Sequence, residues 1–392
     1  MACASDRTNG FLPYPAARVP SADTGMLRGR RLAVKDLFDV AGYPTGAGNG
    51  VVLAASGVKD GTAPIVQAVL DAGAEFVGKT HTDELAYSLI GRNRHFGAPI
   101  NPRWPERIAG GSSSGSAVAV AAGLADIGLG TDTSGSIRLP AAANGLHGWR
   151  PTHGMFSLDG CRPLAPSFDT AGFLTRSLHE VAELMDVFTV AGIDRADVGY
   201  LIAEDILGLC DQPVAERFLQ VLASGKRSCR TTATAFGVDL GEAAAAFGTI
   251  LGREAFVSNQ QLLAQAPQSI DPAIVLRLER GQRLGMREVA EARAIRDQIR
   301  SNLDAVLSGT RVLALPTIPT PPPGIGADES EFDRFRTRSI SLLCIAGLSG
   351  CPQIAVPYFG KDGAYLSISY IAAAGSDRRA LHAAAQIQRP DV

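Results

Sequence analysis

The stretch GGSSSGSAVAVAAGLADIGLGTDTSGSIRLPA, residues 110–141, decides the fold because it joins two glycine-rich turns through one apolar segment. Residues 116–125 are small and apolar on every side, which predicts a helix that is buried all round. Residues 127–132 favour a short buried strand that leads into the second turn. The stretch holds six serines but no histidine and no lysine, so a serine nucleophile here needs a base from elsewhere in the chain.

The two turns flank the predicted helix, so they can lie side by side. Glycines let backbone N–H groups converge without obstruction by a Cβ atom, and converging N–H groups are what an oxyanion intermediate needs. Two tight turns around a packed helix explain the same residues equally well. On the pattern alone, both interpretations stay open.

Segments around this stretch carry alternating strand and helix patterns. Residues 30–40, RRLAVKDLFDV, predict a strand with Lys35 near its end. Residues 62–73 predict a helix with Thr62 as N-cap, a proline in the first turn and a closing glycine. The order of strand, helix and strand predicts an α/β protein with parallel pairing. The other expected elements are a strand over 74–79, a surface helix over 287–307, and strands within 311–323, 352–358 and 364–371.

Composition narrows the class of protein. The 392 residues are 46% hydrophobic and 19% charged with a formal net charge of −2, which is typical of a globular protein and gives no electrostatic footprint for nucleic acid. Neither a signal peptide nor an apolar run of about 18 residues is present, so we expect a cytoplasmic protein without a membrane span. The six cysteines and six histidines are scattered, which predicts free thiols and no metal site.

One short motif offers a candidate nucleophile. GSSSG at 111–115 matches the G-x-S-x-G nucleophile elbow, with Ser113 at its centre and His147 or His153 as possible bases. That motif needs a strand immediately before it, and the preceding residues NPRWPERIAG are typical of a loop. The match is therefore interpreted as loop structure.

A longer pattern carries a family resemblance. GGSSSGSAVAVAAG, followed by LGTDTSGSIRLPAAANGLHGWRPTHG, strongly resembles the amidase signature family, and AVKDLFDV, DELAYS and SFDTAG look most like its plant indole-3-acetamide amidases. The resemblance implies a single-domain α/β fold with a central mixed β-sheet covered by helices on both sides. It places an extended lead-in at 1–27 and the amidase domain at 28–390. Within that domain the core signature spans 106–155, and a variable segment spans 192–284.

The resemblance also implies a catalytic triad of serine, cis-serine and lysine. The matching positions are Ser136 as nucleophile, Ser112 as bridging serine and Lys35 as base. A lysine accepts a proton only when neutral, so its pKa must fall by ~3 units from about 10.4. Burial without a carboxylate partner would lower it in this way. In the family the peptide bond before the bridging serine is cis, which is Gly111–Ser112 here.

Oxyanion donors follow from the same resemblance. They would be the backbone N–H groups of Thr133, Ser134, Gly135 and Ser136, with Gly111 also at the substrate site. The family usually has glycine where Ser134 stands, and a serine would be strained there if the position required a positive φ.

Charged residues near the triad have expected supporting roles. Asp132 and Arg138 bracket the nucleophile turn and are expected to hold it by buried hydrogen bonds, although Arg138 could instead meet an acidic substrate. Lys79 does not match the catalytic position, so we expect it to form a structural ion pair. Asp36 follows Lys35 directly and should point to the other face of the strand.

The predicted function is hydrolysis of a small-molecule amide to a carboxylate and ammonia through an acyl-enzyme, with no cofactor. An arylacetamide such as indole-3-acetamide is the expected substrate, and Tyr87, Ile90 and Phe96 are candidate pocket residues. A homodimer is plausible from the family. Two alternatives are a glutamine-hydrolysing subunit of a tRNA amidotransferase and an amidase-like scaffold or receptor without catalysis.

Overall fold

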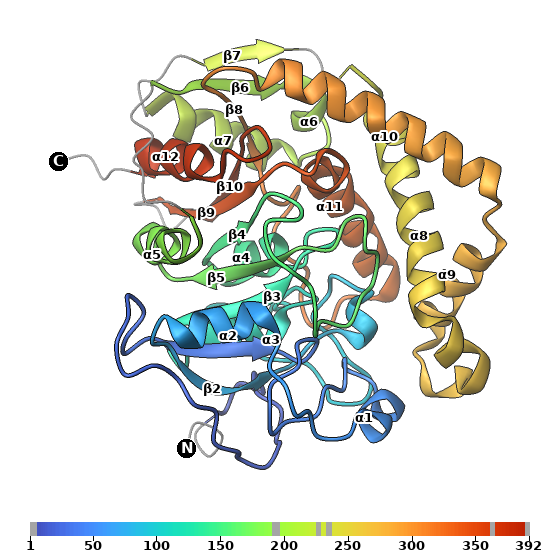
Figure 1. The fold of residues 1–392 in the computed structure, drawn as a ribbon. Helices are drawn as coiled ribbons and strands as arrows, with labels where there is room; N and C mark the ends of the chain where they lie inside the picture. The colour runs from blue at the N-terminus through green and yellow to red at the C-terminus, as the bar shows by residue number, and fades with distance from the viewer. Residues whose placement is uncertain (1–5, 190–196, 225–228, 233–236, 361–364, 389–392) are drawn as a thin grey trace.

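One mixed β-sheet runs through the protein (Figure 1). The computed structural model describes residues 6–189, 197–224, 229–232, 237–360 and 365–388; the predicted lead-in over 1–27 and variable segment over 192–284 lie partly outside them. The described residues form a sheet of 10 strands in the order β2-β1-β3-β5-β4-β9-β10-β8-β6-β7. The strands are β1 (Arg31–Lys35), β2 (Glu75–Thr80), β3 (Ile127–Thr131), β4 (His147–Arg150), β5 (Ala171–Thr175), β6 (Gly199–Ala203), β7 (Cys229–Thr232), β8 (Arg311–Pro316), β9 (Gln353–Phe359) and β10 (Tyr365–Ile371).

The mode of strand pairing changes twice across the sheet, from parallel to antiparallel and back to parallel. β1 lies between β2 and β3 and is parallel to both, as the sequence predicts. β6 is likewise parallel to β7 and β8 at the other end. The strands between these two groups pair in antiparallel fashion, from β3 through β5, β4, β9 and β10 to β8. The predicted α/β fold with a mixed sheet is confirmed.

Helices cover both faces of this sheet (Figure 1). One face is covered by α2 (Pro64–Asp71), α5 (Leu178–Phe188), α7 (Gln212–Ser224) and α12 (Asp377–Gln388). The other is covered by α3 (Ser114–Ala121), α4 (Arg138–Asn144) and α11 (Glu329–Ser349). The remaining helices are α1 (Gly50–Ser56), α6 (Glu204–Leu207), α8 (Leu240–Gln265), α9 (Pro272–Arg283), α10 (Met286–Val306) and the short 3₁₀ turns Glu84–Ala86 and Pro267–Ser269.

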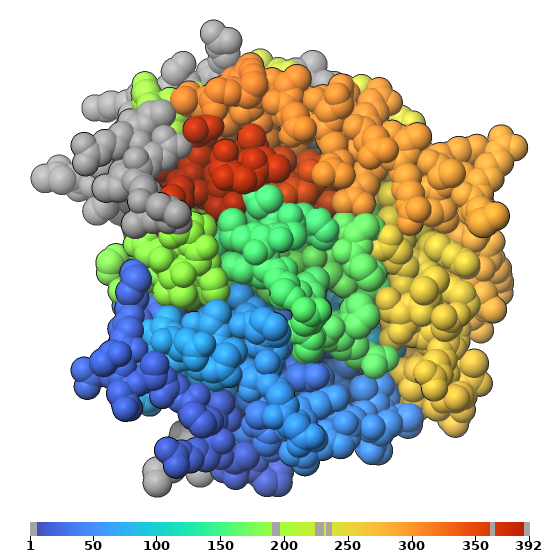
Figure 2. Space-filling view, viewed as in Figure 1, coloured from blue at the N-terminus to red at the C-terminus, as the bar shows by residue number. Residues whose placement is uncertain are grey.

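Helix α8 packs against α9, α10 and α11, and α10 also packs against α11. Figure 2 shows them as one flank of the molecular surface, next to the residues of the N-terminal half. The predicted surface helix over 287–307 is confirmed as α10. This flank matters because α8 supplies one wall of the outer pocket described below.

The opening helix α3 is buried from Ser114 to Val120, as its small apolar residues predict. A Cβ atom at Gly115 would lie 2.3 Å from the carbonyl oxygen of Gly10, so this helix contact requires glycine. At α2 the predicted N-cap is wrong. Ala63 occupies the N-cap without a side-chain bond, and the Thr62 hydroxyl instead accepts a hydrogen bond from the Ala41 N–H at 3.1 Å.

Two further sequence expectations concern thiols and membranes. Cys161, Cys210, Cys344 and Cys351 are free, and the last two are buried; Cys3 lies outside the described residues. Across the described segments, none of the helices has both the length and the apolar character needed to cross a bilayer.

Candidate active site

Lys35 stands at the end of β1 and is completely buried. Its Nζ donates hydrogen bonds to Ser112 Oγ and to Thr131 Oγ1, both at 2.8 Å. Thr131 is the last residue of β3, the strand paired in parallel with β1, so the two strand ends carry these groups to the same edge. The structure therefore joins Lys35 to Ser112 across 77 residues of sequence.

The environment of Lys35 favours the neutral amine. Within the described part of the chain it forms no ion pair and has two hydroxyl partners. Burial lowers the pKa of Lys35 to about 8, against the opposing attraction of Asp83 and, more weakly, of Cys161, Asp132 and Asp169. The neutral amine, which can accept a proton, is therefore a minor form at pH 7 and becomes the major form above about pH 8.

Ser112, the candidate bridging serine, lies in a loop with an unusual backbone. The peptide bond Gly111–Ser112 is cis, as the family resemblance predicts. Asp83 holds this loop: its N–H donates to the Ser112 carbonyl at 3.2 Å. Its Oδ2 accepts from the N–H groups of Ile90 and Gly91 at 3.1 and 3.0 Å. A Cβ atom at Gly111 would lie 2.4 Å from Asp83 Oδ1, which explains the glycine.

Ser136 lies on the turn between β3 and α4, next to the cis loop. Its carbonyl accepts a hydrogen bond from the Ser113 N–H at 3.2 Å. Among the residues that the structure describes, the Ser136 hydroxyl has no hydrogen-bond partner. The Ser113 hydroxyl, by contrast, donates to the Thr131 carbonyl at 3.2 Å, and no strand precedes it. Ser113 is thus a structural residue, and the nucleophile-elbow interpretation has no support.

Four N–H groups in the turn at Ser136 are the predicted oxyanion donors. Those of Thr133, Ser134 and Ser136 donate to no acceptor within the described segments. The Gly135 N–H differs from the other three, because it already donates to Asp132 Oδ1 at 2.9 Å. Gly135 instead supplies a φ of 125°, and a Cβ atom there would lie 2.4 Å from Leu343 Cδ1.

Ser134 fits its position without backbone strain. The described residues with a positive φ other than glycine are Asn9, Ala47, Leu85 and Ala86, and Ser134 is not among them. The positive φ of this turn falls one residue later, on Gly135. A serine in place of the family's usual glycine therefore leaves the shape of the turn intact.

Asp132 anchors the turn. Its Oδ2 accepts from the Ile137 N–H at 3.1 Å and from Arg138 Nε at 2.9 Å. Arg138 Nη2 and Arg150 Nη1 donate to Oδ1 at 2.6 and 3.0 Å, and all three side chains are buried. Burial acts to raise the pKa of Asp132, but Arg138 and then Arg150 outweigh it and hold this pKa well below its usual range. Asp132 and Arg138 hold the turn by buried hydrogen bonds, as the sequence predicts. The sequence analysis did not predict that Arg150 also binds Asp132.

Arg138 does not face a substrate. Its Nη1 donates to the Leu343 carbonyl at 2.8 Å and to Gln353 Oε1 at 2.6 Å, while Nε and Nη2 bind Asp132. Those contacts lie inside the fold, so the alternative in which Arg138 meets an acidic substrate is wrong.

Lys79 forms the structural ion pair that the sequence predicts. Its Nζ lies 2.9 Å from Asp36 Oδ1 and donates to the Phe38 carbonyl at 2.7 Å. The Asp36 carboxylate also accepts from the hydroxyl of Tyr14 at 2.8 Å. Asp36 therefore neutralises Lys79 and leaves Lys35 without a carboxylate partner.

A cavity of about 290 Å³ adjoins this group. Thr131 and Thr133 line it together with apolar side chains that include Leu37 and Leu164. Asp169 closes one side, and its Oδ1 accepts from the Thr133 hydroxyl at 2.6 Å. Asp83, Thr131 and Asp169 were all missed as site residues, although the motifs DELAYS and SFDTAG contain the two carboxylates.

The three residues proposed as pocket liners do not line this cavity. Ala86 lines the cavity in their place, because Leu85 and Ala86 adopt φ angles of 52° and 56° that turn the chain there. Tyr87 lies beneath Arg277, Phe96 packs against His81, and Ile90 lines a separate pocket. The turn sends the side chains after Ala86 away from the cavity.

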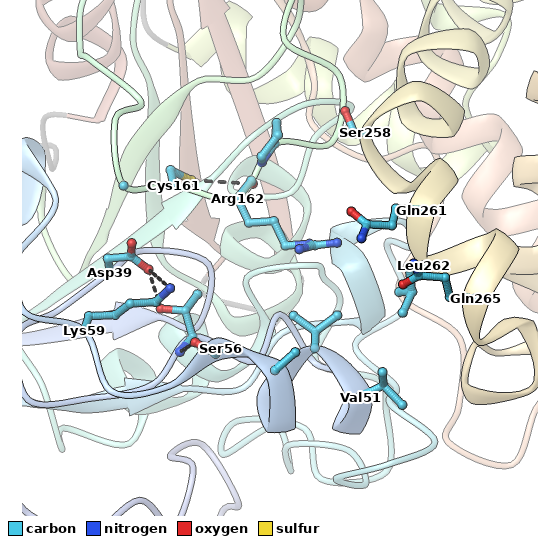
Figure 3. Close-up of a pocket in the computed structure, with 15 residues that line it drawn as sticks. Asp39, Val51, Ser56, Lys59, Cys161, Arg162, Ser258, Gln261, Leu262 and Gln265 are labelled. Carbon is cyan, nitrogen blue, oxygen red and sulfur yellow. Dashed lines mark hydrogen bonds and ion pairs between the residues drawn. The ribbon is translucent and has the colours of Figure 1, made fainter.

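A larger pocket of about 500 Å³ lies outside the cavity (Figure 3). Its walls come from α1 and α8, and its floor from residues 160–163. Cys161, Arg162 and Pro163 line both spaces, so the pocket and the cavity meet at these three residues.

Comparisons with known proteins agree with this geometry. The Amidase family model matches residues 14–215. "Amidase 1" of Oryza sativa subsp. japonica is 36% identical over 93% of this chain and 90% of that protein. "Outer envelope protein 64, chloroplastic" of Arabidopsis thaliana is 32% identical over 94% of this chain and 67% of that protein. A solved structure described as "Crystal structure of amidase" superposes with a TM-score of 0.83 at 31% identity, covering 93% of this chain and 85% of that one. The chain belongs to the amidase signature family of carbon–nitrogen hydrolases.

Proposed function

We propose that this amidase hydrolyses small-molecule amides with Ser136 as nucleophile, Ser112 as proton relay and Lys35 as base. The observation that carries the proposal is the 2.8 Å hydrogen bond between Lys35 Nζ and Ser112 Oγ, made by a buried lysine without an ion-pair partner among the described residues. A serine hydroxyl becomes a useful nucleophile only when a base takes its proton.

Acylation begins when Ser136 Oγ attacks the amide carbonyl carbon. Its proton passes to Ser112 Oγ, while the Ser112 proton passes to the neutral amine of Lys35. The negative charge that develops on the carbonyl oxygen is stabilised by the free N–H groups of Thr133, Ser134 and Ser136. Collapse of the intermediate breaks the carbon–nitrogen bond, and the proton returns through Ser112 to the leaving nitrogen, so ammonia departs.

Deacylation uses the same groups with water in place of ammonia. Lys35, neutral again, draws a proton from water through Ser112, and the water oxygen attacks the acyl carbon. The Ser136 oxygen leaves, regains its proton through the relay, and the carboxylic acid is released. Atoms and protons balance over the cycle, and no cofactor takes part.

The cavity supports a small acyl group. Its volume of about 290 Å³ and its apolar wall, which includes Leu37, Leu158 and Leu164, suit a flat apolar substituent next to the reacting carbonyl. An arylacetamide such as indole-3-acetamide, the substrate class implied by the resemblance to plant amidases, is the substrate class we propose.

Two other functions compete with this proposal. A glutamine-hydrolysing subunit of a tRNA amidotransferase depends on partner subunits, whereas we expect the purified chain alone to release ammonia from phenylacetamide and indole-3-acetamide. A scaffold or receptor of amidase ancestry needs no catalytic residues, whereas Lys35, Ser112 and Ser136 are all present. Ammonia release by the isolated chain therefore separates the three functions.

Ser136→Ala is the decisive variant. We expect it to abolish ammonia release while the far-UV circular dichroism and the melting temperature stay at wild-type values. Ser113→Ala is the matched control, because its hydroxyl makes a backbone hydrogen bond and takes no part in the relay. Ammonia release that survives in Ser136→Ala would rule out the assignment of the nucleophile.

A further inference from the structure

Arg162 projects into the outer pocket of about 500 Å³ (Figure 3). Its side chain extends from the floor of the pocket toward α8, where Nη2 donates to Asn259 Oδ1 at 3.1 Å. Asn259 is itself fixed, because its Nδ2 donates to the Ala255 carbonyl at 3.0 Å. The guanidinium group is therefore held in one place by a neutral amide.

No carboxylate pairs with this guanidinium in the described residues. Burial alone lowers the pKa of Arg162, with no acidic group opposing it, and Nε and Nη1 have no acceptor in the parts of the chain that the structure describes. The arginines beside the nucleophile turn differ, since Arg138 and Arg150 both bind Asp132. Arg162 is partly buried, so its charge is incompletely solvated and an anionic ligand in the pocket would compensate it.

Other charged groups of the outer pocket are already paired. Lys59 Nζ lies 3.7 Å from Asp39 Oδ1, and Asp39 also accepts from the Thr45 hydroxyl at 2.7 Å. Asp159 lines the inner cavity, and within the described residues it forms no ion pair with Arg162. Arg162 is thus the cation of this pocket whose charge is left uncompensated.

Its position connects Arg162 to the reaction. Cys161, Arg162 and Pro163 form the boundary between the inner cavity and the outer pocket. The inner cavity also contains Thr131, the hydroxyl partner of Lys35. Thr133, whose N–H belongs to the turn before Ser136, lines the same cavity as Arg162, so this cavity reaches from that turn to the guanidinium group.

We propose that Arg162 binds a carboxylate at the far end of the acyl group, so that the preferred substrates are amides of acids that carry a second, anionic group. The guanidinium fork matches a carboxylate with two parallel N–H donors. Gln261 and Gln265 of α8 line the same pocket and supply further hydrogen-bond donors. This inference rests on the proposed amidase function and narrows its substrate class from arylacetamides in general to those with an acidic substituent.

The test uses three amides of the arylacetamide class. Phenylacetamide has no substituent, and 4-carboxyphenylacetamide is compared with its uncharged methyl ester, which is of similar size. Ammonia release gives kcat/KM for each compound with the full-length wild-type protein and with Arg162→Gln. We expect the wild type to prefer 4-carboxyphenylacetamide over the ester by about tenfold to hundredfold, the range of a charge-assisted hydrogen bond. In Arg162→Gln the ratio should fall to about one, mainly through KM.

Arg293→Gln is the matched control, because it removes an arginine outside both spaces that already lies 3.6 Å from Glu254 Oε1. Its preference ratio should stay within about twofold of the wild-type value, since a paired surface charge contributes little. An equal loss of the ratio in both variants, or a wild type that prefers the ester, overturns the role of Arg162. Absence of Ser136-dependent ammonia release from every compound instead overturns the proposed function, so the two failures are distinguishable.

Discussion

Two lysines lie on adjacent strands of the sheet, and both are fully buried. Lys35 ends β1, and Lys79 lies on β2, one register position away, where it pairs with Val34. Lys79 has a carboxylate 2.9 Å away on Asp36, whereas Lys35 has the hydroxyls of Ser112 and Thr131. Burial lowers the pKa of both lysines, but the Asp36 carboxylate opposes this shift directly at Lys79.

The comparison teaches that burial alone does not suit a lysine to the role of base that we propose for Lys35. Asp36 follows Lys35 in sequence, yet the alternation of side chains turns it toward Lys79 on the other side of the sheet. The Asp36 carboxylate therefore accounts for both environments. It stabilises the charge of Lys79, and it forms no ion pair with Lys35. The variants below test this division.

Of the variants that test this comparison, Lys35→Ala should have the largest effect on the reaction. Removal of a general base lowers kcat/KM by about 10² to 10⁴-fold, measured as ammonia release from phenylacetamide. The melting temperature should not fall, because the variant removes a desolvated amine without breaking an ion pair. Activity within tenfold of the wild type would contradict the assignment of Lys35 as base.

Lys79→Met should lower the unfolding free energy of the protein. It leaves the Asp36 carboxylate buried without its cation, and breaking a buried ion pair in this way costs about 3–5 kcal/mol of unfolding free energy. Urea unfolding followed by circular dichroism measures this loss. The double variant Asp36→Asn with Lys79→Met removes both charges and should recover most of it. A cost below about 1 kcal/mol for Lys79→Met would show that the pair is not structural.

The pH dependence of activity follows from the depressed pKa of Lys35. The neutral amine is the active form, so kcat/KM should rise as pH increases through about 8 and level off above it. A flat profile between pH 6 and 9.5 would exclude a lysine base.

The unfolding free energy should also depend on whether Lys35 is protonated. The folded state disfavours protonated Lys35, so this residue destabilises the fold below pH 8. The penalty disappears as pH rises from about 8 toward the unfolded value of 10.5, a change of about 3 kcal/mol by linkage. The difference in unfolding free energy between the wild type and Lys35→Met isolates this effect, and that difference should shrink over the same interval. A difference that does not change with pH would mean that Lys35 is charged in the folded protein.

The sequence predicts those parts of the site that depend on local pattern or on the family motif. Lys35 at a strand end, the buried helix α3 and the cis bond before Ser112 are all found in the structure. Thr131 and Asp83 were missed because their roles arise from contacts between distant segments. The contact of Asp83 with the Ser112 carbonyl, for example, exists only once β2 has packed beside α3.

Local backbone geometry was equally hard to predict. Leu85 and Ala86 adopt positive φ angles that neither residue type favours, and this turn decides which side chain faces the cavity. Propensities gave no signal for it, so Tyr87 was placed in the pocket instead of Ala86. The hydrogen bond that withdraws the Gly135 N–H from the oxyanion turn likewise depends on the orientation of the Asp132 carboxylate.

The smallest effect is expected at Ser134. Because Ser134 has no positive φ, glycine relieves no strain there and only adds freedom to the unfolded chain, at a cost of about 0.4–1 kcal/mol. Ser134→Gly should therefore keep kcat/KM within about twofold of the wild type, since its N–H stays in place. Gly135→Ala is the contrasting variant: its Cβ would lie 2.4 Å from Leu343 Cδ1 on a backbone with a φ of 125°, so both activity and stability should fall sharply. If Ser134→Gly raised kcat tenfold, the serine itself would be holding the oxyanion turn in a less reactive shape.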